Sequence, residues 1–270
     1  MEQVDVVIIG AGASGLMCAA TAGYRGRSVR VLEHSNKIGR KILMSGGGRC
    51  NFTNLHNGPH NFLSANPHFC KSALSRFSAQ DFIELVERHG IDYHEKTLGQ
   101  LFCDESSKEI LQLLLTECEW AGVEIRTATS VTEVQKIDGG FTLATSAGAI
   151  RCQSLVVATG GLSIPNGGAT SFAYDLARQF GLEVSALQAA LVPFTLQPNE
   201  LAHFKPLAGV SHPVAIRIGK QAFSENMLFT HRGLSGPAVL QISSYWVPGT
   251  EVEIDLFPSL NLLEWLQQAR

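Results

Sequence analysis

The chain has 270 residues, enough for one large domain or two smaller ones, and its hydrophobic share of 45% is ordinary for a globular protein. The net charge of -3 comes from interspersed acidic and basic residues, with no basic–aromatic patch and no basic amphipathic helix, so we expect neither a nucleic-acid nor a membrane partner. Six scattered cysteines without a C-x-x-C pair, and nine histidines without ligand spacing, favour reduced thiols in the cytoplasm over disulfides or a metal site.

The first predicted element is a buried parallel strand over residues 6–9, followed by a glycine fingerprint and an uncharged helical stretch. Gly10, Gly12 and Gly15 form the pattern G-x-G-x-x-G. Gly10 allows a tight turn, Gly12 lets the backbone approach a pyrophosphate, and Gly15 lets the helix pack closely on the sheet. The N-terminus of such a helix offers free N–H groups and a positive dipole end to phosphates.

A second strand over residues 29–32 runs into Glu33, which lies 21 positions after Gly12. At that place a carboxylate can accept hydrogen bonds from a ribose diol. Strand, glycines, helix, second strand and acid occur in the order that a dinucleotide-binding βαβ unit requires. The alternative interpretation is a glycine-rich turn in some other α/β protein.

Later elements alternate and then change character. Helices are predicted over 78–89, 107–121 and 170–180, with a strand over 123–126. Short strands over 131–137, 141–145 and 149–152 form a β-meander, and a buried strand over 155–157 runs into Ala-Thr-Gly-Gly. From residue 191, prolines punctuate short β-like segments such as 214–218 and 252–256, and a last helix begins near 260.

These patterns predict an α/β fold. A Rossmann-like FAD-binding domain, with a parallel sheet and a β-meander, is expected over residues 1–190. Residues 191–270 are expected to form a second, β-rich domain, which the family resemblance described below implies to be an incomplete insert.

Three features favour FAD over NAD as the bound dinucleotide. The glycine run at 45–51 lies soon after Glu33, and its backbone N–H groups and Arg49 suit a phosphate or the electron-rich end of a flavin. A β-meander precedes the strand that ends at 158–161, and the segment before that strand is longer than an NAD-binding repeat requires. The alternatives are a mobile surface turn at 45–49, an ordinary strand end at 158–161, and solvated charges at Arg40 and Lys41.

Several strings in the chain are distinctive together. They are G-A-G-A-S-G-L (10–16), G-R-K (39–41), M-S-G-G-G-R-C-N-F-T-N (44–54), A-T-G-G (158–161), A-L-V-P-F (190–194) and F-T-H-R-G-L-S-G-P (229–237). With them the chain resembles the bacterial NAD(P)/FAD-dependent oxidoreductases of the YhiN/BaiN-like (aminoacetone oxidase-like) type. The resemblance extends over essentially all of the chain.

On the matching positions, the resemblance implies an FAD site. The pyrophosphate would lie at the glycine fingerprint, the adenosine ribose at Glu33, the adenine beside the backbone of Val131, and the flavin within the glycine run. The implied residues are Gly10, Gly12, Ala13, Ser14, Gly15, Glu33, Arg40, Lys41, Ser45, Gly46, Gly47, Gly48, Arg49, Cys50, Asn51, Val131, Ala158, Thr159, Gly160 and Gly161. Residues from 191 onward would form an insert that roofs the active site.

Two departures from the family pattern affect this prediction. Where the family has a run like T-G-S-T-G-D-G-Y after Pro165, this chain reads G-G-A-T-S-F-A-Y, so a Gly-Asp-Gly element and its acidic partner are expected to be missing. Family members also continue well past this length and close over the flavin with a glycine-rich segment. The chain is therefore expected to correspond to the N-terminal two thirds of such a flavoprotein.

The resemblance implies an FAD-dependent oxidoreductase that moves a hydride through the flavin N5 between a small organic substrate and NAD(P)H or oxygen. No catalytic base is assigned. Cys50 and His231 are candidates, against the alternatives of a small buried residue and of a histidine bonded to the loop at 233–236. The alternative functions are a truncated flavin- or nucleotide-binding module without turnover and, disfavoured by the slightly acidic charge, a flavin-dependent tRNA-modifying enzyme.

Overall fold

The computed structural model of the chain describes residues 1–164 and 168–268. Pro165 and Gly167, at the start of the segment where the Gly-Asp-Gly element is expected to be lost, lie outside the described residues. The chain divides into two compact units, Met1–Val184 and Ser185–Arg270, and each is described by itself. Within the described ranges, every helix is too short or too polar to cross a bilayer.

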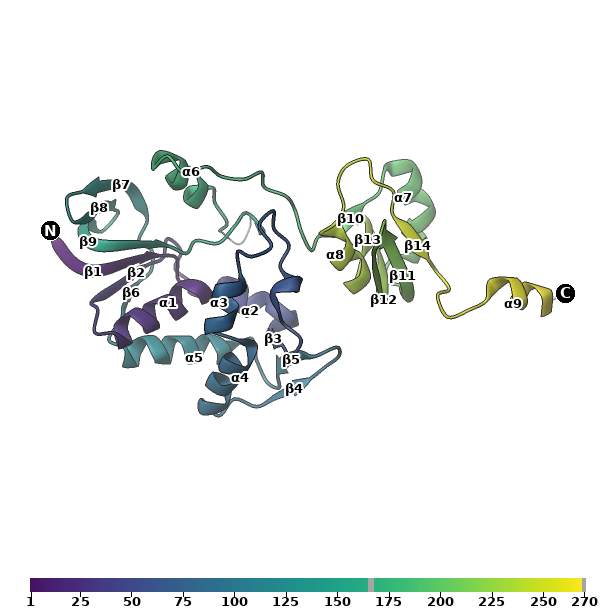
Figure 1. The fold of residues 1–270 in the computed structure, drawn as a ribbon, viewed down its shortest axis with the longest axis horizontal. Helices are drawn as coiled ribbons and strands as arrows, with labels where there is room; N and C mark the ends of the chain where they lie inside the picture. The colour runs from purple at the N-terminus through teal and green to yellow at the C-terminus, as the bar shows by residue number, and fades with distance from the viewer. Residues whose placement is uncertain (165–167, 269–270) are drawn as a thin grey trace. The chain divides into compact units, whose positions relative to one another are not determined.

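The first unit is built on a six-stranded sheet (Figure 1). Its order is β6 (Glu124–Arg126), β2 (Val29–Leu32), β1 (Glu2–Ile9), β9 (Gly148–Val157), β8 (Gly140–Thr145) and β7 (Val131–Ile137). The first four strands are parallel, whereas β9, β8 and β7 pair in antiparallel fashion. The predicted Rossmann-like sheet and β-meander are therefore confirmed.

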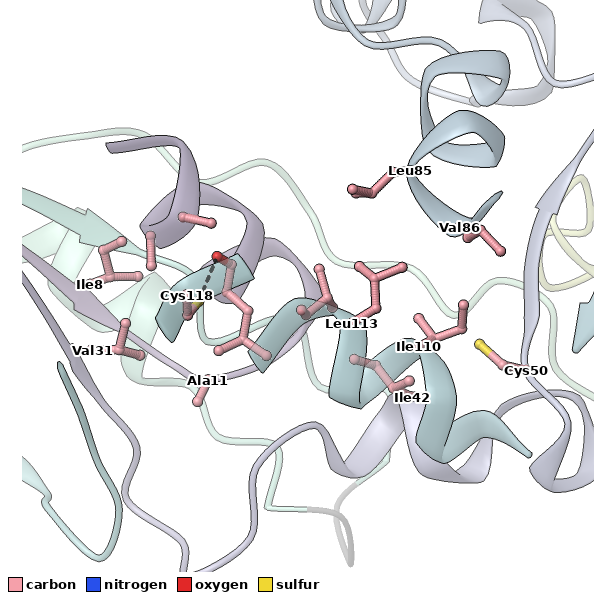
Figure 2. Close-up of a cluster of buried hydrophobic side chains, with 14 of the residues drawn as sticks. Ile8, Ala11, Val31, Ile42, Cys50, Leu85, Val86, Ile110, Leu113 and Cys118 are labelled. Carbon is pink, nitrogen blue, oxygen red and sulfur yellow. Dashed lines mark hydrogen bonds between the residues drawn. The ribbon is translucent and has the colours of Figure 1, made fainter. Parts of the chain in front are cut away.

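The sheet is covered on both faces, which explains why the start of the chain is almost continuously apolar. Ile8 of β1 packs toward helices α1 (Ala13–Tyr24), α4 (Ala79–Arg88) and α5 (Ser107–Trp120) in one cluster of buried residues, part of which is drawn in Figure 2. Its neighbours Val7 and Ile9 point to the other face and join Leu176 of α6 (Phe172–Gln179) in a second cluster. Alternation along one strand therefore anchors both layers.

The predicted helices at 78–89, 107–121 and 170–180 are confirmed within one or two residues as α4, α5 and α6. Ser78 caps α4 by accepting a hydrogen bond from the Asp81 N–H, and the Asp81 carboxylate accepts one from the Ser78 N–H. This reciprocal cap satisfies two N–H groups that a helix start leaves without partners. The strands expected at 149–152 and 155–157 form one strand, β9, because the chain stays extended between them and Ser154 continues the pairing with β1.

Several elements of the first unit were not predicted. A three-stranded sheet joins β3 (Asn51–Asn54), β5 (Gln100–Cys103) and β4 (Tyr93–Glu95). Before it come helix α2 (Arg40–Met44) and a 3-10 turn over Ser45–Gly48, and between β3 and α4 lie a 3-10 turn at Pro59–Asn61 and helix α3 (Lys71–Arg76).

The second unit contains a five-stranded antiparallel sheet. Its order is β10 (Phe194–Thr195), β13 (Gly233–Ser235), β12 (Gln221–Thr230), β11 (Ser211–Ile218) and β14 (Glu253–Asp255). Helix α8 (Pro237–Ser243) covers one face, where Val239 and Ile242 pack with Ile216 and Met227. Helices α7 (Pro198–Phe204) and α9 (Leu262–Gln268) complete the unit. This part of the chain is β-rich, as predicted, and its description as an insert stays a prediction.

Candidate dinucleotide site

A cavity of about 550 Å³ opens where the first, parallel strands of the sheet end. Ligands of open α/β sheets bind outside the carboxyl ends of the strands, and this volume lies in the range of small-molecule pockets. Eleven of the predicted cofactor residues line it: Gly10, Gly12, Ala13, Ser14, Glu33, Arg40, Lys41, Val131, Ala158, Thr159 and Gly160.

The three glycines of the fingerprint meet different surroundings. Gly10 has a φ of +108°, and a Cβ built on it would lie 2.6 Å from the Ala158 carbonyl oxygen. A Cβ on Gly15 would lie 1.9 Å from the Gly10 carbonyl oxygen, so only glycine lets the helix pack on the turn. A Cβ on Gly12 would meet nothing within 4 Å. The glycine that faces the cavity thus has free space in front of its backbone.

Helix α1 begins at the cavity without a side-chain cap. Gly12 is the N-cap residue, and it has no side chain that accepts from the first turn. Ala13 and Ser14 of that turn line the cavity. Because the first N–H groups of a helix lack intrahelical partners, they and the helix dipole favour an anionic group at this position.

Glu33 lies at the mouth of the β1–α1–β2 crossover. Its Oε2 accepts a hydrogen bond of 3.0 Å from the Ala11 N–H, and its Oε1 accepts one of 2.9 Å from the Ser35 N–H. The imidazole Nδ1 of His34 lies 3.1 Å from the same Oε1. These contacts hold the carboxylate at the cavity wall, where a ribose hydroxyl can donate to it.

Both basic residues at the start of α2 line the cavity. The ammonium of Lys41 donates to Ser163 Oγ at 2.7 Å and lies 3.5 Å from the Gly161 carbonyl oxygen. Lys41 therefore links α2 to the segment after β9. This contact disfavours the alternative interpretation of Lys41 as an ordinary solvated charge. Gly161 itself does not line the cavity.

Thr159 carries a hydroxyl that needs a partner. Its Oγ1 is buried, and no other described residue forms a hydrogen bond with it. A buried hydroxyl without a partner costs free energy unless something outside the chain bonds to it.

Val131 lies on the cavity wall at the start of β7. Thr129, two residues earlier, is buried, and its N–H donates to the Glu33 carbonyl oxygen at 2.9 Å.

The glycine run does not line this cavity; none of residues 45–51 is on its wall. Gly46 and Gly47 have left-handed φ values of 57° and 67°, and Arg49 and Asn51 are exposed. A Cβ on Gly46 would lie 2.6 Å from the Asn51 N and 2.8 Å from the Phe102 ring, so the turn is tightly folded on β5. Contact of this run with a cofactor stays a prediction.

Cys50 is buried in the core. Figure 2 shows its thiol pointing toward Ile110 of α5. Burial raises the pKa of the Cys50 thiol, although a hydrogen bond with Ser45 lowers it in part. A buried neutral thiol is a weak nucleophile, which favours the alternative of a packed core residue.

His231 lies in the second unit, in the turn between β12 and β13, and is exposed. The turn is held by Thr230, whose Oγ1 accepts from the N–H groups of Arg232 and Gly233. In the part of the chain that the structure describes, the His231 ring forms no hydrogen bond, so it does not brace the loop at 233–236.

Sequence reasoning missed part of the cavity wall. Besides neighbours of predicted residues, the cavity is lined by His34, Lys37, Gly39, Thr129, Ser130, Gly168, Ala169, Thr170 and Phe172. For Gly39 the sequence did contain a signal, because this glycine opens the G-R-K string. In the structure it has a left-handed φ of 65° just before α2, and its N–H donates to the Ala11 carbonyl oxygen. Thr129 reaches the cavity through a backbone hydrogen bond with Glu33, which is far away in the sequence, and no local pattern encodes that pairing.

The described residues fit FAD. An uncapped helix start suits the diphosphate, free space at Gly12 admits it, and the Thr159 hydroxyl lacks a partner. A Rossmann unit with this site belongs to the dinucleotide-binding flavoproteins of the oxidoreductase class.

The particular family follows from sequence comparison: the chain belongs to the HI0933-like family, whose Rossmann-domain description matches residues 4–244. It is 55% identical over 271 residues to the ribosomal RNA dihydrouridine synthase of Escherichia coli K12, and 51% identical over 274 residues to that of Haemophilus influenzae. Both matches cover 100% of this chain and 68% of the relative. A 3-dehydro-bile acid delta(4,6)-reductase of Clostridium scindens is 28% identical over 268 residues, covering 94% of this chain and 64% of that protein.

Proposed function

We propose that the protein is an FAD-dependent reductase that converts uridine in ribosomal RNA to dihydrouridine, with NAD(P)H as the electron donor. The observation that carries the proposal is the match of the whole chain to two ribosomal RNA dihydrouridine synthases. The cavity at the glycine fingerprint supports it, because it offers the site that a flavin cofactor needs.

The C5–C6 double bond of uridine is conjugated with the C4 carbonyl, so its reduction takes a hydride at C6 and a proton at C5. Bound FAD, once reduced by NAD(P)H, would supply the hydride. The chain's own residues hold the cofactor: the start of α1 receives the diphosphate, Glu33 the ribose and Thr159 a polar atom of the ligand. Neither Cys50 nor His231 is assigned the proton transfer.

This proposal differs from the sequence-based expectation of a small organic substrate and no nucleic-acid partner, which the structure does not test. The slightly acidic net charge of the whole chain disfavoured an RNA substrate, but a net charge does not describe the charge of a local surface. Reduction of a small conjugated ketone is the second candidate function, favoured by the bile acid reductase among the relatives.

The test uses the purified chain with FAD and either NADPH or NADH. An unmodified transcript of 23S or 16S ribosomal RNA is the substrate, and DNA of the same sequence is the control. The RNA is digested to nucleosides, and mass spectrometry measures dihydrouridine. We expect dihydrouridine from the RNA and no reduced base from the DNA.

The other functions give different results in the same assay. Consumption of NAD(P)H with a conjugated steroid ketone, and none with RNA, would replace the proposal by the second candidate. A protein that holds FAD but oxidises NAD(P)H with neither substrate would be the binding module without turnover.

A further inference from the structure

The stretch of the chain between Glu33 and Asp81 has an unusual charge. No Asp or Glu occurs between Glu33 and Asp81, and this stretch contains six Lys and Arg residues although the whole chain carries -3. The segment at 56–76 holds two of these six cations, Lys71 and Arg76. It also contains three histidines and two phenylalanines: His56, His60, His68, Phe62 and Phe69. The net charge of the whole chain conceals this stretch, which the expectation of no basic–aromatic patch overlooked.

The same segment is exposed. Every residue from 60 to 69 is exposed, and helix α3 buries none of its residues. Phe69 is 80% exposed and Phe62 is 46% exposed. Apolar surface that is left exposed in one stretch of the chain can mark a contact surface.

The segment has local order despite its exposure. Asn66 accepts a hydrogen bond from the His68 N–H at 3.0 Å, and the Cys70 thiol donates to the Pro59 carbonyl oxygen at 3.8 Å. At its end, Phe77 packs edge-on against Phe82 of α4, with ring centroids 6.4 Å apart. Phe62, Phe69 and the two cations therefore lie on a turn-rich connection between β3 and α4, and Phe77 anchors the end of this connection on α4.

We propose that residues 56–76 form a contact surface for unpaired nucleotides of ribosomal RNA. The inference rests on the proposed function. Phe62 and Phe69 provide flat faces on which bases stack, while Lys71 and Arg76 lie opposite phosphates. The absence of carboxylates removes repulsion from the RNA backbone. Phe77 is left outside this surface because it lines a surface pocket together with Asp81, Glu84, Glu87 and Arg88 of α4, where carboxylates predominate.

The experiment measures RNA affinity of the FAD-loaded chain by fluorescence anisotropy. The probe is a fluorescein-labelled oligouridine of about 12 nucleotides, within the site sizes of single-strand binders. Affinity is measured over a series of NaCl concentrations for the unmodified chain and three double variants. These are Lys71→Gln with Arg76→Gln, Phe62→Leu with Phe69→Leu, and, as the matched control, Arg25→Gln with Lys136→Gln.

We expect the two surface variants to weaken binding for different physical reasons. Loss of two phosphate contacts lowers the slope of log affinity against log salt by about 1.4. Loss of stacking weakens binding about 5- to 100-fold and leaves the slope unchanged. The control variant removes the same charge from exposed positions of α1's end and β7, and keeps both affinity and slope.

The outcomes separate this inference from the proposed function. RNA binding that all variants retain, with dihydrouridine still formed, would overturn the surface and leave the function standing. No RNA binding by the unmodified chain, together with no dihydrouridine, would overturn both. A change of oligomeric state in the Phe62 and Phe69 variant, with RNA affinity kept, would assign the rings to self-association and reject the inference. Photocrosslinking of the unmodified chain to the probe, mapped by mass spectrometry to 56–76, supports it without any substitution.

Discussion

The Glu33 carboxylate and the Ala11 backbone are joined by a hydrogen bond of 3.0 Å, which ties the end of β2 to the glycine turn. One side chain therefore holds the turn and faces the cavity. Glu33→Ala removes both functions, and we expect FAD to bind about 10- to 100-fold more weakly, since a hydrogen bond to a charged group contributes about 1.5–3 kcal/mol. Titration of the apoprotein with FAD, followed by flavin fluorescence, measures it.

Glu33→Gln refines this prediction. Its single amide oxygen can accept from Ala11 or from Ser35, but not from both, so we expect an intermediate affinity. Glu84→Gln, an exposed change on α4, is the control and should bind FAD like the unmodified chain. Equal FAD affinity of Glu33→Ala and the control would remove Glu33 from the site.

Two glycines of the fingerprint should respond differently to the same methyl group. Gly15→Ala places a Cβ 1.9 Å from the Gly10 carbonyl oxygen, and such overpacking costs about 1–3 kcal/mol of folding free energy. Gly12→Ala meets open space, so apoprotein stability stays the same while the methyl group obstructs the diphosphate. Urea unfolding of the apoprotein and FAD titration separate the two effects. A Gly15→Ala protein of unchanged stability would contradict the packing described for α1.

Thr159→Val is expected to have opposite effects on stability and on binding. It replaces a buried hydroxyl without a partner by a methyl group of similar shape, so the apoprotein should gain about 1 kcal/mol. FAD should bind more weakly, because the ligand loses a hydrogen-bond partner. Thr159→Ser keeps the hydroxyl and serves as the matched variant. A lower free energy of unfolding for the Thr159→Val apoprotein would mean that the hydroxyl already has a hydrogen-bond partner in the apoprotein.

Glu117 should contribute to the pH dependence of stability. Its carboxylate in α5 accepts a hydrogen bond from the Tyr24 hydroxyl of α1 and contacts the Nε2 of His89 at the end of α4, each at 2.8 Å. Burial raises the pKa of Glu117, but hydrogen bonds from His89 and Tyr24 outweigh it and bring the pKa below the usual 4.5. The carboxylate therefore stabilises the fold fully above about pH 4.5, and this contribution is lost as the pH falls through the lower, folded-state value.

Glu117→Gln should thus lower the free energy of unfolding by about 1–3 kcal/mol at neutral pH and by less in acid. Denaturant unfolding at a series of pH values measures the difference. A constant difference between the two proteins across the acid range would show that Glu117 does not titrate as proposed.

His231 remains a candidate for substrate binding or proton transfer. We expect His231→Ala to leave the spectrum of bound flavin intact and to slow turnover. The absorbance of the holoprotein and steady-state NAD(P)H oxidation provide the measurements. The exposed Arg232→Gln is a neighbouring control. Unchanged kinetics of His231→Ala would discard the role.

The sequence predicted the parts of the fold that depend on local pattern. The apolar run of β1, the fingerprint glycines and Glu33 define the crossover because each element's conformation is dictated by its own residues. The start of α4 was likewise evident from Ser78, which is a favourable cap.

The rest depended on contacts between distant segments. Thr129 reaches the cavity because it bonds to the Glu33 backbone, and nothing near Thr129 in the sequence signals that pairing. The small sheet of β3, β5 and β4 was missed because its strands are short and its pairing shifts register between Asn51 and Thr53. The unpredicted α2 begins after Gly39, which adopts a left-handed conformation that favours glycine.

Strand β9 serves two structures at once. Over residues 150–157 it pairs with β1 of the parallel sheet, and over Gly148–Cys152 it also pairs with β8 of the meander. Strand β7, which begins at Val131, is joined through β8 to β9, which leads to Thr159, so the two walls of the cavity belong to one continuous sheet. Amide hydrogens on β1, β8 and β9 should exchange with solvent as a single cooperative unit, so that the cleft cannot lose one wall by partial opening while the other persists.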